Sequence, residues 1–149
     1  MPIENFPFSA NGGGIARPYL PVLIINPHMG KRVSTFALID TGADECAIPA
    51  GYAFILGHDL VKGREKIIGT GNGYTAAYTH TTTMEIFHPV TKSVIYRMSD
   101  IPVDFLPNLH AVLLGASNFL DRFILTVDYP QQIFSIKYPP NHHVSAVDS

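Results

Sequence analysis

Glycine and proline divide this chain into short apolar segments, and that pattern limits the folds open to it. The sequence holds 12 glycines and 12 prolines, scattered along its length, so no apolar segment is long enough for an extended helix. Short β-branched, aliphatic and aromatic segments bounded by turn-forming residues are typical of β-strands. The 149 residues, 46% of them hydrophobic, suit one globular domain. We therefore expect a single, mostly β domain.

The strands can be placed from these segments. Tyr19–Ile25 and Val33–Ile39 flank the turn formers of Asn26–Lys31, which predicts a hairpin. Tyr74–Phe87 alternates in polarity and predicts a long, half-buried strand. Further strands are expected over Ser93–Arg97, Ile101–Leu106, Val112–Leu114, Ile124–Val127 and Ile133–Lys137.

One short helix is predicted near the C-terminal end, over Ser117–Phe123. Ser117 can cap it, and Phe119 and Phe123 fall on one face at helical spacing. The domain is expected to cover residues 17–138, between a loose N-terminal segment at 1–16 and a flexible tail at 139–149.

Charge and composition argue against several classes of function. The formal net charge is -2, and the ten lysines and arginines form no basic stripe, so we expect no nucleic-acid partner. No apolar run is long enough to cross a bilayer, which predicts no membrane partner. The single cysteine, Cys46, excludes an internal disulfide framework. With no signal-like apolar segment near the start, these features predict a cytoplasmic protein.

The most informative stretch is Phe36–Asp44, in which an apolar strand runs directly into Asp40-Thr41-Gly42. A carboxylate at the end of a buried strand is costly unless several donors satisfy it. Gly42 lets the backbone turn so that its amides point at Asp40. An Asx-type turn without catalytic meaning explains this stretch equally well.

Two later segments add to this motif. Ala111–Gly115 is an aliphatic strand that ends in glycine and leads into the predicted helix, although a simple strand–helix junction has the same pattern. Gly69–Gly73 is glycine-rich and precedes the long strand. A phosphate-binding loop would open a helix instead, and no Lys-Ser/Thr pair ends this one.

These three elements, in this order, resemble the retropepsin-like aspartic proteases, single-domain enzymes typified by the retroviral proteases. The resemblance runs from about Arg17 to Ile136. It implies a closed, β-barrel-like acid protease fold with one short C-terminal helix, working as a homodimer without metal or cofactor. The glycine-rich segment corresponds to a flap over the cleft.

The resemblance also assigns roles to residues. Asp40, Thr41 and Gly42 would be catalytic, with Thr41 bonding across the dimer axis. The residues expected to bind substrate are Ala43, Asp44, Gly69, Thr70, Gly71, Asn72, Gly73 and Tyr74. Asp44 has the alternative of an exposed loop carboxylate, and Tyr74 that of a strand anchored in the core.

Aspartic proteolysis needs two carboxylates that share one proton, and this chain has one Asp-Thr-Gly. The resemblance therefore implies an endopeptidase in which two Asp40 side chains meet across a two-fold axis and activate water. The alternative is a catalytically idle dimer of the same fold that binds a peptide or a partner protein. Viral members often carry arginine after the second glycine, where this chain has Ala116, so the contact that this arginine makes with the dimer interface is either missing or made by Arg17 or Arg122.

Two other chemistries have weaker support. Seven histidines are present, but they show no HExxH or similar spacing, so no metal site is predicted. Cys46 has no local signature of a thiol protease and is more typical of a small buried residue.

Overall fold

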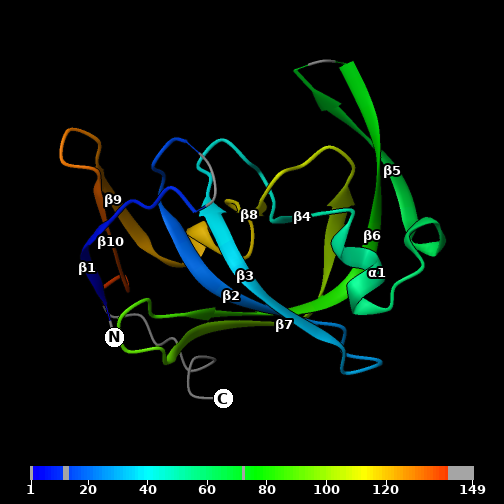
Figure 1. The fold of residues 1–149 in the computed structure, drawn as a ribbon, viewed down its shortest axis with the longest axis horizontal. Coiled ribbons are helices and arrows are strands. Elements are labelled where there is room, and N and C mark those ends of the chain that lie inside the picture. The colour runs from blue at the N-terminus through cyan, green and yellow to red at the C-terminus, as the bar shows by residue number, and fades with distance from the viewer. Residues whose placement is uncertain (1, 12–13, 72, 141–149) are drawn as a thin grey trace.

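A computed structural model describes residues 2–11, 14–71 and 73–140 of the chain (Figure 1). Strands dominate these residues, as predicted. They are β1 (Ile3–Pro7), β2 (Tyr19–Ile25), β3 (Arg32–Ile39), β4 (Ala47–Pro49), β5 (Arg64–Thr70), β6 (Gly73–Phe87), β7 (Val94–Leu106), β8 (Val112–Leu114), β9 (Ile124–Asp128) and β10 (Ile133–Lys137). One α-helix, α1 (Tyr52–Leu56), and two 3-10 turns, η1 (Leu60–Lys62) and η2 (Leu120–Arg122), complete the described elements.

Six of the strands close into a barrel. The larger sheet has the order β2-β3-β8-β4-β7-β6-β5, and β2 also pairs with β6, which joins the two ends of the six-strand ring. β5 extends the sheet outside the ring by pairing with β6. Closure leaves few free strand edges, which suits a chain rich in short strands.

Alternate residues of the barrel strands point inward, and their side chains form the core. In β2, Leu20, Val22 and Ile24 are buried, as expected for a strand with one face toward a core. Ile48 of β4 and Leu114 of β8 are fully buried with them. Burial of this apolar surface is the main stabilising contribution to the fold.

The predicted strands occur largely where expected. The β2–β3 hairpin is confirmed, with a register from Tyr19↔Leu38 to Ile25↔Arg32. The two strands predicted on either side of Ser99-Asp100 form one strand, β7. Asp100 adopts a left-handed φ of 52°, and its amide donates to Thr83 Oγ1 at 3.1 Å. We expected a strand to end at Ser99-Asp100, but a β-bulge accommodates these two polar residues within β7 instead.

The helix predicted over Ser117–Phe123 is shorter than expected. Only the 3-10 turn η2 forms there, and no side-chain hydrogen bond caps it. Phe119 and Phe123 are both buried and their rings contact each other, so this segment packs into the core without forming an α-helix. The α-helix of the described chain is α1, which was not predicted. No helix in the described ranges has the length and apolar character needed to cross a membrane.

The N-terminal segment at 1–16 is not loose throughout. β1 pairs with β10, which pairs with β9, and the three strands form a second sheet at the left of Figure 1. Ile3 is buried between them and the core. The prediction missed β1 because Glu4 and Asn5 interrupt its apolar pattern. Most of the predicted tail, residues 141–149, lies outside the described residues.

Candidate active site

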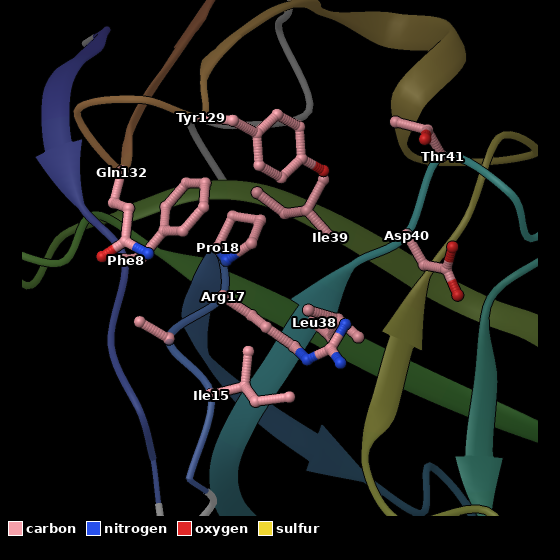
Figure 2. A pocket seen from close by; sticks show the side chains of 11 residues that line it. Phe8, Ile15, Arg17, Pro18, Leu38, Ile39, Asp40, Thr41, Tyr129 and Gln132 are labelled. Carbon is pink, nitrogen blue, oxygen red and sulfur yellow. The ribbon is translucent and has the colours of Figure 1, made fainter.

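Asp40 lies directly after β3, where the barrel fixes its backbone. β3 runs parallel to β8, and the Asp40 amide donates to Leu114 O at 3.1 Å. The Gly42 amide donates to Asp40 Oδ1 at 2.9 Å, so the turn inferred from the sequence is present. Figure 2 shows the half-buried carboxylate pointing away from Phe8 and Tyr129. The turn therefore holds an accessible carboxylate that already accepts one backbone hydrogen bond.

Gly115 lets a second loop approach the one that carries Asp40. The amides of Ala116 and Ser117 donate to Ala43 O at 2.9 Å and to Asp44 O at 2.8 Å. A Cβ added to Gly115 would lie 2.5 Å from Glu45 O and 2.8 Å from Ala43 O. Both contacts are with backbone atoms, so glycine is required here for close packing.

The glycine-rich segment forms the end of a hairpin. β5 and β6 pair antiparallel from Arg64↔Thr79 to Thr70↔Gly73, which leaves a two-residue connection. Gly73 has a φ of 117°, a value that favours glycine. In Figure 1 this hairpin extends to the upper right, and the end of β3 also points toward the top of the picture.

A cavity of about 590 Å³, which we call the main cavity, separates the hairpin from the loop after β3. Its lining includes Asp40, Gly42, Ala43, Asp44, Glu45, Lys66, Ile68, Gly69, Gly71, Asp104, Leu106 and Leu113. The cavity brings together six of the residues predicted for the site, from segments far apart in the sequence. Its size fits several side chains of a peptide.

The other predicted site residues are placed differently. Thr41 is exposed and lines a second cavity, whereas Gly73 and Tyr74 are not among the lining residues of the first. The Tyr74 side chain is 84% exposed, so Tyr74 is also not anchored in the core. It pairs with Gly69 on the hairpin face opposite that of Ile68. Thr70 takes part in backbone pairing with Gly73, and Asn72 lies outside the described residues.

The second cavity, of about 330 Å³, lies on the other side of Asp40. Its lining residues are Phe8, Ile15, Ala16, Arg17, Pro18, Leu38, Ile39, Asp40, Thr41, Tyr129 and Gln132 (Figure 2). Arg17 therefore lies beside Asp40 and Thr41. Arg122 instead contacts its neighbour Asp121, with 3.3 Å between Nε and Oδ1.

Three charged residues of the main cavity were missed by sequence reasoning. Lys66 Nζ donates to Asp104 Oδ2 at 2.8 Å and lies 3.5 Å from Glu45 Oε2. The hydrogen bond to Asp104 is the main cause of the raised pKa of Lys66. A carboxylate between Val103 and Phe105 in an apolar strand was the signal that could have identified Asp104.

The buried thiol of Cys46 does not fit a nucleophile. Burial raises its pKa to about 11, so the thiol is protonated at neutral pH, and only the thiolate attacks. In the described part of the chain, no three His, Cys, Asp or Glu side chains gather as they would around a metal ion.

The chain matches no protein-family model and no curated protein. Among solved structures it is similar to the crystal structure of a retropepsin-like aspartic protease from Rickettsia conorii, with a TM-score of 0.59 and 22% sequence identity. The similarity covers 91% of this chain and 96% of that one. The fold is retropepsin-like. The expected closed, mostly β acid-protease fold is thereby confirmed, and its barrel places Asp40 and the β5–β6 hairpin on opposite sides of one cavity.

Proposed function

We propose that this chain is an aspartic endopeptidase that hydrolyses peptide bonds with water activated between two Asp40 carboxylates. The observation that carries the proposal is the position of Asp40. It follows a buried barrel strand, accepts a hydrogen bond from Gly42, and lines a cavity enclosed on another side by a glycine-rich hairpin. The retropepsin-like fold supports the same function.

The chemistry requires a second copy of the chain. Two carboxylates about 3 Å apart cannot both ionise, so they share one proton. One carboxylate then acts as a base toward water, while the other donates its proton to the carbonyl oxygen of the peptide. Because each chain supplies one Asp-Thr-Gly, the pair forms across the two-fold axis of a homodimer. The two Asp40 groups titrate as a unit.

Neighbouring residues have supporting roles in this proposal. Thr41 is exposed beside Asp40, so its hydroxyl is available to bond to the partner copy. Asp44 is exposed in the cavity lining and is available to accept hydrogen bonds from the substrate backbone. The β5–β6 hairpin acts as a flap that covers the peptide and excludes bulk solvent, apart from the water molecule that reacts.

The proposal is tested by comparing wild type with Asp40→Asn. Both are incubated with a peptide library at mildly acidic pH, where a shared proton is retained, and their dimerisation is measured by sedimentation in the same buffer. Asp59→Asn is the control, because Asp59 is an exposed carboxylate near α1, paired with Lys62. We expect cleavage by wild type and by the control, and none by Asp40→Asn.

Two results contradict the proposal: cleavage that survives in Asp40→Asn, or a wild-type dimer that cleaves nothing. A dimer that binds peptides without cleaving them would identify the chain as the idle binding protein instead. A chain that stays monomeric at all concentrations also excludes a site made from two Asp40 residues.

A further inference from the structure

One end of the main cavity carries a group of charges that the proposed chemistry does not use. We call this group the charged wall and define it as Glu45, Lys66 and Asp104. All three line the same cavity as Asp40. They come from three places in the fold: the loop before β4, the hairpin strand β5, and the barrel strand β7.

Within the wall, Lys66 and Asp104 form a salt bridge. The Asp104 side chain is 8% exposed, and its Oδ2 accepts from Lys66 Nζ at 2.8 Å while its Oδ1 accepts from Thr79 Oγ1 at 2.8 Å. Lys66 lies opposite the small residue Ala77 on β6, so its side chain can reach past that strand to β7. The two charges neutralise each other, and both oxygens of the buried carboxylate have a donor.

Glu45 carries the surplus charge of the wall. Its side chain is 57% exposed, and its 3.5 Å contact with Lys66 is longer than the contact between Lys66 and Asp104. Asp44 is also exposed and adds a further carboxylate to the lining. The carboxylates that line the cavity therefore outnumber its one ammonium, that of Lys66, and the potential in the cavity is negative.

Apolar surface lies next to the charged wall. Ile68 follows Lys66 by two residues on the same face of β5, and Leu106 follows Asp104 in the same way on β7; both line the cavity. A lysine or arginine side chain has an apolar stem and a charged end, so it matches a surface with this order of groups.

We propose that the charged wall selects substrates with a basic side chain, lysine or arginine, at one position of the bound peptide. The inference rests on the proposed function and names the substrate class of the same site. Glu45 is the main partner of the incoming cation, and the stem lies against Ile68 and Leu106. An acidic side chain at that position is repelled, because Lys66 is already paired with Asp104.

The test measures binding on Asp40→Asn, so that its outcome does not depend on cleavage. The probes are fluorescein-labelled, end-capped octapeptides of leucine and alanine, in which lysine, norleucine or glutamate replaces each position in turn. At one position we expect lysine to bind about three- to tenfold more tightly than norleucine, which has a similar stem and no charge. Glutamate at that position is expected to bind most weakly.

A second substitution, Glu45→Gln, identifies the group responsible. It should remove the preference for lysine over norleucine. The matched control is Glu65→Gln, which makes the same charge change on β5 one residue from Lys66. The Glu65 side chain contacts Tyr78 and does not line the cavity, so this control should keep the preference.

The proposal is overturned if lysine and norleucine bind equally at every position, if glutamate binds more tightly than lysine, or if no lysine peptide binds. It is also overturned if Glu45→Gln keeps the preference, or if Glu65→Gln loses it equally. Because cleavage by wild type is measured separately, any of these results leaves the test of the proposed function intact.

Discussion

Gly115 is the position at which a single methyl group should damage the site most. The residue lies in the fully packed junction after β8, where an added Cβ would meet Glu45 O at 2.5 Å, Glu45 C at 2.7 Å and Ala43 O at 2.8 Å. All three are backbone atoms of the loop that follows Asp40. In Gly115→Ala this loop must move, since no flexible side chain can yield instead.

The cost can be estimated from the contacts involved. Overpacking a well-packed site destabilises a protein by about 1–3 kcal/mol. The shift also strains the hydrogen bonds from Ala116 to Ala43 and from Ser117 to Asp44, each of which contributes about 1 kcal/mol. We expect Gly115→Ala to lose about 2–4 kcal/mol of unfolding free energy, and to lose peptide cleavage because Asp40 belongs to the displaced turn.

Urea unfolding at a fixed protomer concentration measures this loss. Tyrosine fluorescence is a suitable signal, because the chain has seven tyrosines and no tryptophan. The control is Gly51→Ala: Gly51 has a φ of -61°, and an added Cβ would have nothing within 4 Å. The control should change stability by less than about 1 kcal/mol. An unfolding midpoint for Gly115→Ala equal to that of the control would refute the packing argument.

Three further predictions concern stability. Burial, helped by the charges of neighbouring histidines, lowers the pKa of His58 from 6.5 to about 4. As pH falls, the unfolded chain therefore binds this proton before the folded chain does, so the free energy of unfolding should decrease from about pH 6.5 to pH 4. His58→Gln should flatten this part of the plot of unfolding free energy against pH, whereas the exposed control His110→Gln should not. Leu114→Ala removes a fully buried side chain from the barrel and should cost about 2–5 kcal/mol in urea unfolding; a loss under 1 kcal/mol would contradict its place in the core. Asp104→Asn should lower the melting temperature in calorimetry, because Lys66 loses its closest partner, and an unchanged value would show that the pair contributes no stability.

The sequence indicates those parts of the fold that depend on local patterns. β2, β8 and β10 occur over the predicted residues, since each is a β-branched or aliphatic segment next to turn formers. β5 was missed because it begins with Arg64-Glu65-Lys66, which has no apolar pattern, and its pairing with β6 stabilises it.

In the candidate site, too, local sequence patterns predict some features and not others. The turn at Asp40 and the glycine at 115 follow from residues adjacent in the sequence, so local reasoning located them. The pair of Lys66 and Asp104 joins two strands that are not neighbours in the sheet, and only the sheet order brings them together. Tyr74 was expected in the cleft, but which face of the hairpin it occupies depends on the register of β5 and β6.

The central claim is that one active site needs Asp40 from two chains, and mixed dimers test it most directly. Wild type and Asp40→Asn are unfolded in urea, combined in equal amounts and refolded together. Random pairing gives about one quarter of dimers with both Asp40 residues, so cleavage per total protein should fall to about a quarter of the wild-type value. A fall to one half would show that each chain works alone and would contradict the claim.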